Sequence, residues 1–370
     1  MRMLSSVILL SSIVAVACGG GSGSSSAAKI AFFVDKFGSR AIYVSNAEGT
    51  GLTSLTADLP WESFPVWSPD GERIVFYSSR DDPSHPRDIY VVDADGGAIT
   101  NLTADAGEDA LPAWSPDGER IAFYSDRDGN GDVYLMDPDG SNVTRLTDDP
   151  AVDFPFAWSP DGTRLALGSF RDGNLEIYIL NADGSGLRRI TKSPGSDFGP
   201  SWSPDGTRIA FESDRDGNSE VYVVDVDDPR PVNLTVRPLR DAAPAWSPAS
   251  DSIAFVSNRE GDPDIYIMDV NYSYVTRATY TAREDAGPAW SPDGERIAYV
   301  SKRDFNPEIY VMRPDGSGRI RLTEDPAPDR GPAWSPDGSR IAFESFRDGT
   351  SEIYVVRQNG TGLIRLTGGP

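Results

Sequence analysis

Residues 112–147 read PAWSPDGERIAFYSDRDGNGDVYLMDPDGSNVTRLT, and the fold follows from this stretch. Its apolar runs are short and show no helical period. Pro, Asp, Gly and Asn separate the runs in three tight turns, at residues 116–118, 127–130 and 138–141. The pattern predicts four short antiparallel strands, one ending at Trp114 and the others containing residues 121–123, 133–135 and 146–147.

The same pattern recurs from residue 27 to the last residues of the chain. Seven tryptophans mark it, at Trp67, Trp114, Trp158, Trp202, Trp246, Trp290 and Trp334. The first interval is 47 residues and the next five are 44 residues each. Each of these tryptophans precedes Ser-Pro, and Asp-Gly completes the turn except at residues 247–250, which read Ser-Pro-Ala-Ser. Four antiparallel strands in a repeat of this length predict the blade of a β-propeller.

The repeated tryptophans are interpreted as packing residues rather than as a series of ligand-stacking rings. They recur together with the apolar Ile-Ala-Phe and Ile-Tyr-Val motifs of the following strands. A blade must bury these side chains against its neighbours, and one buried Trp covers roughly 150–250 Å². We therefore expect the seven tryptophans to form the core of the repeat.

The repeat leaves the number of blades open. An interval of 13 residues from Tyr to Thr recurs eight times, from Tyr43–Thr56 to Tyr354–Thr367, so eight units contain the second, third and fourth strands. Seven units contain the first strand, and a closing Trp-Ser-Pro strand is missing after Thr367. We expect an all-β propeller of four-stranded antiparallel blades, with eight blades of which the first is incomplete. The alternative is seven blades with a peripheral N-terminal unit.

The N-terminus predicts export and a lipid anchor. Arg2 precedes an apolar stretch at residues 4–16 that is too short to span a bilayer comfortably, and residues 15–17 are small. Cys18 follows directly and precedes a flexible Gly/Ser segment. The Ala-Val-Ala-Cys junction resembles the lipobox of bacterial lipoproteins. That resemblance implies a signal peptide over residues 1–17, a lipidated Cys18 and tether over residues 18–26, and the propeller over residues 27–370.

Charge and cysteine content exclude several classes of partner and site. The chain has 34 Lys plus Arg against 57 Asp plus Glu, a formal net charge of −23. This charge opposes binding to nucleic acid or to anionic lipid headgroups, so we expect membrane contact through the lipid alone. Cationic peptides and basic protein surfaces remain suitable partners. The single cysteine excludes an intramolecular disulfide and a Cys-rich metal site.

Motifs for catalysis are absent from the sequence. The only histidine, His85, stands in a loop between prolines, and no Gly-x-Ser-x-Gly, Walker-type or dinucleotide motif occurs. Asp126, Asp128 and Asn130 have the spacing of a calcium loop, but a strand follows them and related Arg-Asp-Gly turns recur without the ligand set. We interpret this segment as a hairpin turn. We therefore predict no catalytic residue, no cofactor and no metal site.

A repeated carboxylate is the candidate ligand-binding feature. It stands five residues before the Trp in six of the seven units, at Asp109, Asp153, Asp197, Asp241, Asp285 and Asp329. Strand direction places these residues at the same face as Arg127, Arg171, Arg215, Arg259, Arg303 and Arg347. Because the first strand lines the channel, we expect the carboxylates at its rim, facing a cationic ligand or a donor of many hydrogen bonds. In the alternative, each carboxylate bonds to its own loop or pairs with a neighbouring Arg.

The motifs WSPDGxRIAF, IYVMDxDG and LT together resemble the WD-like repeat of the TolB propeller family over residues 27–370. The resemblance implies protein partners in a bacterial cell envelope. We expect a monomeric, non-enzymatic lipoprotein, periplasmic or surface-facing, that binds an envelope protein or peptide with a basic surface. The alternative is an enzyme or enzyme remnant acting on carbohydrate or peptide. A catalytic pair would break the symmetry of the repeat, and the departures fall instead at residues 82–87 and 271–280.

Overall fold

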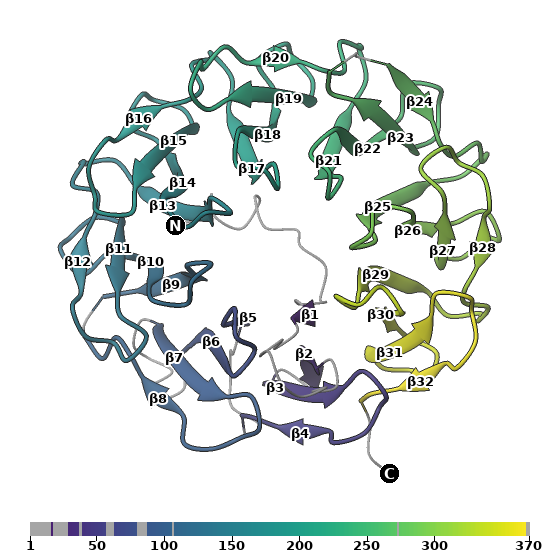
Figure 1. Cartoon of the computed structure of the whole chain (residues 1–370), viewed down its shortest axis with the longest axis horizontal. Coiled ribbons are helices and arrows are strands. Elements are labelled where there is room, and N and C mark those ends of the chain that lie inside the picture. The colour runs from purple at the N-terminus through teal and green to yellow at the C-terminus, as the bar shows by residue number, and fades with distance from the viewer. Residues whose placement is uncertain are drawn as a thin grey trace.

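The chain is a ring of β-sheets. The computed structural model describes residues 16–17, 29–36, 39–56, 63–79, 87–105, 107–271 and 274–367, and these residues contain eight four-stranded sheets and no helix. Figure 1 shows the sheets arranged around a central axis, each with its first strand nearest the centre. This confirms a β-propeller of eight blades with antiparallel strands.

The blades follow one another in chain order. Blade 1 contains β1 (Val16–Ala17), β2 (Lys29–Lys36), β3 (Ser39–Asn46) and β4 (Thr53–Ser54). Blade 2 contains β5 (Ser63–Trp67), β6 (Arg73–Ser78), β7 (Asp88–Asp93) and β8 (Thr100–Asn101). Blade 3 contains β9 (Asp109–Trp114), β10 (Ile121–Ser125), β11 (Asp132–Met136) and β12 (Thr144–Arg145). Blade 4 contains β13 (Asp153–Trp158), β14 (Arg164–Ser169), β15 (Glu176–Asn181) and β16 (Arg188–Arg189).

The second half of the ring repeats this order. Blade 5 contains β17 (Asp197–Trp202), β18 (Arg208–Ser213), β19 (Glu220–Asp225) and β20 (Val232–Asn233). Blade 6 contains β21 (Asp241–Trp246), β22 (Ser252–Ser257), β23 (Asp264–Asp269) and β24 (Val275–Arg277). Blade 7 contains β25 (Asp285–Trp290), β26 (Ile297–Ser301), β27 (Glu308–Met312) and β28 (Ile320–Arg321). Blade 8 contains β29 (Asp329–Trp334), β30 (Arg340–Ser345), β31 (Glu352–Arg357) and β32 (Ile364–Arg365).

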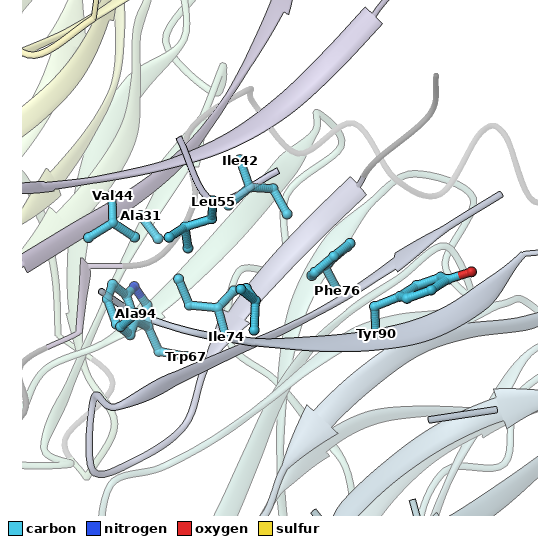
Figure 2. Close-up of a cluster of buried hydrophobic side chains, with 10 residues drawn as sticks. Ala31, Ile42, Val44, Leu55, Trp67, Ile74, Phe76, Tyr90 and Ala94 are labelled. Carbon is cyan, nitrogen blue, oxygen red and sulfur yellow. The ribbon is translucent and has the colours of Figure 1, made fainter. Parts of the chain in front are cut away.

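The hydrophobic core consists of layers between neighbouring blades. Strands alternate their side chains between two faces, and both faces of the second and third strands are covered here because each blade packs between two others. Figure 2 shows the layer between blades 1 and 2, where Ala31, Ile42, Val44 and Leu55 meet Trp67, Ile74, Phe76 and Tyr90. The layer between blades 3 and 4 joins Ala122, Val133 and Leu135 to Trp158 and Leu165.

In blades 4 to 8 the repeated tryptophan links its blade to the one before it. Trp202 is 7% exposed, and its indole Nε1–H donates to the carbonyl oxygen of Ala157 in the inner strand of blade 4 at 3.2 Å. The same bond recurs from Trp158 to Ala113, Trp246 to Ser201, Trp290 to Ala245 and Trp334 to Ala289, at 2.9–3.0 Å. These side chains therefore combine apolar burial with a polar bond between blades.

The turn after each tryptophan is held by its own side chains. In blade 3 the Ser115 hydroxyl donates to the Asp117 carboxylate, which accepts the backbone N–H of Glu119 at 3.0 Å. Gly118 occupies a left-handed conformation with φ of 72°.

Blade 6 lacks the Asp-Gly pair of this turn and replaces its contacts. Ser250 takes the left-handed position at φ of 61°, and Asp251 accepts the Ser247 hydroxyl bond at 2.9 Å. The Ser250 hydroxyl also accepts the Asp205 N–H of blade 5 at 3.0 Å. The departure at residues 247–250 therefore keeps the turn closed.

Blade 8 closes on blade 1 through side-chain packing. Ile30 and Phe32 of β2 pack with Ile353 and Val355 of β31, and an Arg340–Glu48 ion pair at 3.6 Å lies across the same junction. The repeat supplies only β2, β3 and β4 to blade 1, which confirms that the first blade is incomplete. The two-residue β1, from the segment predicted to be a signal peptide, pairs antiparallel with the inner edge of β2, Val16 opposite Ile30.

Candidate binding face

The six repeated aspartates begin the innermost strands of blades 3 to 8. The start of each inner strand pairs with the end of the second strand, as in Asp109 opposite Ser125, so the loop entering a blade and the loop between its second and third strands share one face. We call this the Asp face. The six side chains are fully buried, each with 0% of its surface exposed: Asp109, Asp153, Asp197, Asp241, Asp285 and Asp329. They lie beneath the Asp face rather than on its surface.

Five of the six aspartates form ion pairs with the arginine of the second turn in their own blade. Arg215 Nη2 lies 2.8 Å from Asp197, its Nε donates to the Ser213 hydroxyl at 2.8 Å, and its guanidinium lies 4.3 Å from the Tyr222 ring centroid. The other pairs are Arg127–Asp109 at 3.0 Å, Arg171–Asp153 at 2.6 Å, Arg259–Asp241 at 3.0 Å and Arg347–Asp329 at 2.9 Å. The buried carboxylates are thus covered by arginines, which leaves little free negative charge at these positions.

Blade 7 departs from this arrangement. Among the described residues Asp285 has no ion pair, and its carboxylate lies 3.1 Å from the Thr281 hydroxyl. Arg303 stacks on Tyr310 at 4.7 Å, but its Nη2 atom and one oxygen of Asp285 are buried without a hydrogen-bond partner in the described structure. A buried guanidinium nitrogen without an acceptor is costly.

Burial raises the pKa of five of these aspartates despite their partners. The pKa of Asp109 rises to about 6 because loss of solvent outweighs the bonds from Ser125 and Arg127. Burial also raises the pKa values of Asp153, Asp197, Asp285 and Asp329. Raised carboxyl pKa values accompany both structural ion pairs and functional sites, so they do not by themselves identify a site.

The loops on the Asp face share one length but differ in chemistry. Each loop between a repeated Thr and the next Asp contains five residues, as in Thr147 to Asp153 and Thr235 to Asp241. The loop entering blade 4 carries Asp148 and Asp149. The loop entering blade 6 has the exposed Arg237 and Arg240 in place of such acids. The blades therefore share their buried bonds and differ in their exposed loops.

Two further departures from the repeat lie on the Asp face. In blade 4, the rings of Phe154 and Phe156 meet edge to face at 4.9 Å, and a Cβ atom on Gly168 would lie 2.7 Å from the Phe156 ring. In blade 7, Phe305 stands in the turn where blades 3 to 6 and 8 have Gly, and it is 82% exposed with φ of 80°. Sequence reasoning missed Phe305, although Arg-Asp-Phe-Asn beside Arg-Asp-Gly-Asn was the signal.

Other predicted features fall in different places. The aromatic stretch at residues 271–280 divides between two faces: Tyr280, 63% exposed, lies in a loop of the Asp face, and Tyr274, 75% exposed, lies in the turn between β23 and β24 on the opposite face. Cys18, the Gly/Ser tether and His85 lie outside the described residues. No helix in the described ranges is long and apolar enough to cross a membrane.

The residues with calcium-loop spacing are engaged in other bonds. The Asp126 carboxylate accepts the Glu108 N–H, the Tyr134 hydroxyl donates to Asp128 at 2.5 Å, and Asn130 donates to the Asp132 carboxylate at 2.9 Å. These bonds hold the hairpin between the second and third strands. Within the described part of the chain, no group of three or more His, Cys, Asp or Glu side chains is arranged to hold a metal ion.

Fold and face together define the class: an eight-bladed propeller whose blades repeat a Trp-Ser-Pro turn and a buried Asp–Arg layer, with variable loops on one face. The model of the TolB β-propeller domain matches residues 82–153, 149–238, 215–287 and 282–369. The chain therefore belongs to the TolB β-propeller domain family, as the repeat motifs indicated. No curated protein matches the chain.

Solved structures resemble the chain at low sequence identity. A putative TolB from Agrobacterium tumefaciens is 26% identical, over 61% of this chain and 84% of its own, with a TM-score of 0.46. Dipeptidyl peptidase 4 from Porphyromonas gingivalis is 14% identical, over 90% of this chain and 57% of its own, with a TM-score of 0.70. Oligogalacturonate lyase from Vibrio parahaemolyticus is 15% identical, over 89% of this chain and 96% of its own, with a TM-score of 0.61. The last two likenesses concern the fold alone.

Proposed function

We propose that this protein is a non-enzymatic binding scaffold of a bacterial cell envelope, and that its Asp face binds an envelope protein or peptide. One observation carries the proposal: the repeated Asp and Arg side chains bond to each other within five of the six blades that have them, while the exposed loops of this face differ from blade to blade. The Asp197–Arg215 pair is buried and stacked on Tyr222. The exposed Arg237 and Arg240 have no counterpart in the loop entering blade 4. Variable loops on a rigid frame are a common way to build a recognition surface.

Export and anchoring belong to the same proposal. The lipobox-like junction at Cys18 would hold the propeller at a membrane through its lipid, with residues 18–26 as a flexible tether. Membership of the TolB propeller family supports a place in the envelope and a protein partner. A tethered ring can turn either face toward a partner, so the binding face has to be tested directly.

The test blocks one face at a time. Lys192→Cys places a thiol on the Asp face and Asp95→Cys places one on the turn between β7 and β8, on the opposite face, and each thiol is then coupled to polyethylene glycol. Both full-length variants are cross-linked to their partner in envelope preparations, and we expect both to capture the same partner before polyethylene glycol is attached. After attachment, we expect capture to be lost for Lys192→Cys alone. Capture that survives there and is lost at Asp95→Cys would move the site to the opposite face. Absence of any captured protein, together with turnover of oligogalacturonate or peptide substrates, would favour the enzymatic alternative.

A further inference from the structure

We propose that a patch on the Asp face of blades 6 and 7 binds an acidic segment of a partner protein that carries an aromatic or aliphatic side chain among its carboxylates. The patch, called here the basic–aromatic patch, consists of Val236, Arg237, Arg240, Tyr280, Arg283 and Phe305. The inference rests on the proposed binding function of the Asp face and specifies the chemistry of the partner.

Phe305 has a strained backbone conformation, which the equivalent turns of other blades reach with Gly. Its φ is 80°, a left-handed value that Gly adopts freely and that a bulky side chain occupies only at a cost. Blades 3 to 6 and 8 build the same turn with Gly, as at Gly129 and Gly349. The ring is 82% exposed, so burial does not offset the strain. Strained residues of this kind gather at ligand-binding positions.

A second strained apolar residue lies in the neighbouring blade. Val236, in the loop that enters blade 6, has a φ of 28° and is 71% exposed, although β-branched residues are strongly disfavoured at positive φ. Tyr280, in the loop that enters blade 7, is 63% exposed. Three exposed apolar or aromatic side chains therefore come from adjacent loops of one face.

Arginines without an ion pair in the described structure lie in the same loops as these exposed side chains. Arg237, Arg240 and Arg283 are exposed, and none forms an ion pair with a residue that the structure describes. The Arg283 guanidinium lies 4.3 Å from the centroid of the Phe305 ring, a cation–π contact that does not use up its N–H groups as hydrogen-bond donors. The nearby Glu284 is paired with Lys302. The patch is thus a local positive region on a chain with a net charge of −23.

The broken ion pair of blade 7 lies next to this patch. Arg303, two residues before Phe305, does not reach Asp285 and keeps Nη2 buried without an acceptor in the described structure. Blades 3 to 6 and 8 retain this pair. Strain, exposure and the missing pair therefore coincide in one blade.

Charge favours a protein partner over a membrane or a second copy of the chain. A body with a net charge of −23 is repelled from anionic lipid headgroups and from a like-charged copy. Glu260 and Asp262, exposed in the adjoining turn of blade 6, border the patch and would repel a uniformly anionic surface. A short segment with a few carboxylates is repelled far less than a whole like-charged body or an anionic surface, and it can place its carboxylates on the arginines and its apolar side chain on the rings.

The probe is a fluorescent peptide with one phenylalanine between two runs of three glutamates, measured by anisotropy against the full-length protein. We expect the same peptide with glutamine in place of glutamate to bind at least about tenfold more weakly, since the arginines then lose their charged partners. Phe305→Gly should weaken binding at least about fivefold and should melt at the same temperature or higher, because Gly relieves the strain. Replacing residues 236–240 by the Asp-Asp-Pro-Ala-Val of residues 148–152 keeps loop length and proline position, and should abolish binding.

Two controls and five outcomes decide the proposal. Phe170→Asp removes another exposed ring of the Asp face, Arg230→Gln removes an arginine from the opposite face, and both should bind the peptide as the wild type does. No binding to the wild type, or equal binding by Phe305→Gly, overturns the proposal. Phosphatidylglycerol vesicles that bind in place of the peptide, or self-association in sedimentation that Phe305→Gly removes, would assign the patch to lipid or to a second copy. If the envelope partner is blocked at coupled Lys192→Cys but captured normally by the patch variants, the proposed function stands and this inference falls.

Discussion

Asp109 lies at the start of β9 with no exposed surface, beneath Arg127 and within reach of Thr103 from the preceding blade. Its place in the repeat could be predicted from the sequence, because a fixed spacing from Trp114 puts it at one end of the inner strand. Its burial could not, because the groups that cover it come from the second turn of its own blade and from the blade before. Phe305 was harder still, since its exposure depends on the conformation of a single turn.

The buried aspartates predict an unusual dependence of stability on pH. Burial raises the pKa of Asp109 to about 6 in the folded protein against an ordinary value of 3.8, so the folded state binds more protons than the unfolded state between these values. Its contribution to the free energy of unfolding therefore rises as pH falls from above 6 toward 3.8. We expect a melting temperature at pH 5 equal to or higher than that at pH 7, measured by calorimetry.

The turn aspartates act in the opposite direction at lower pH. The Ser115 hydroxyl lowers the pKa of Asp117 below 3.8, so the stability that this group contributes is present above that pH and is lost as pH falls through its folded pKa. We expect the melting temperature to fall steeply below pH 3.8. Asp109→Asn should reduce the increase in melting temperature between pH 7 and pH 5. A wild-type melting temperature that declines steadily from pH 7 to pH 5 would contradict the raised pKa values.

At the scale of the strand, the repeat pattern predicted the order and approximate place of all four strands in a blade. It did not predict the irregularity of the inner strand, where Leu111 has φ of 54° and the pairing of β9 with β10 shifts register. Such a bulge depends on which residues line the channel, and Pro155 gives blade 4 a different one. The fourth strands are also only two or three residues long, because each pairs with a single neighbour at the outer edge.

We expect the tryptophan of an inner strand to stabilise the fold both through its buried apolar area and through the hydrogen bond of its indole N–H. Trp202→Ala should lower the free energy of unfolding by about 3–5 kcal/mol, measured by urea denaturation, because it empties a buried site between blades 4 and 5. Trp202→Phe keeps most of the apolar area and loses the 3.2 Å bond to Ala157, so its loss should be smaller, about 1–3 kcal/mol. Equal losses for the two variants would contradict this, because they would show that phenylalanine recovers none of the stability that the buried indole ring provides.

At the scale of the whole molecule, eight repeat units could be recognised in the sequence, but the way in which the ring closes could not be predicted from it. Closure depends on contacts between the two ends of the repeat, which no local pattern encodes. In the structure Gly49 of blade 1 faces Ile364 and Leu366 of blade 8, and its counterpart Gly140 of blade 3 faces Leu102 of blade 2, which stands at the same repeat position as Leu366. The junction between the ends is therefore built like the other blade contacts, through side chains, without a shared strand from the repeat.

A matched pair of variants measures this junction. Gly49 and Gly96 occupy the same turn in blades 1 and 2, with φ of 76° and 93°, so alanine costs about 1 kcal/mol of backbone strain at either position. A Cβ atom at Gly49 would lie 2.3 Å from Ile364, whereas at Gly96 the nearest atom is 3.6 Å away. We expect Gly49→Ala to lose about 1–3 kcal/mol more of the free energy of unfolding than Gly96→Ala, measured in urea, and to unfold in one cooperative transition. Equal losses, or two separate transitions, would mean that the ring is not closed at this junction.

The direction of the tryptophan bonds has a consequence for the time course of synthesis. Each indole donates to a carbonyl of the blade before it in the chain, from Trp158 onward to Trp334. A blade that has just been made therefore finds its acceptor on a blade that is already complete, and the propeller can grow from the N-terminal side as the chain is synthesised. The contact between blades 8 and 1 requires both ends of the repeat, so it is the last to form.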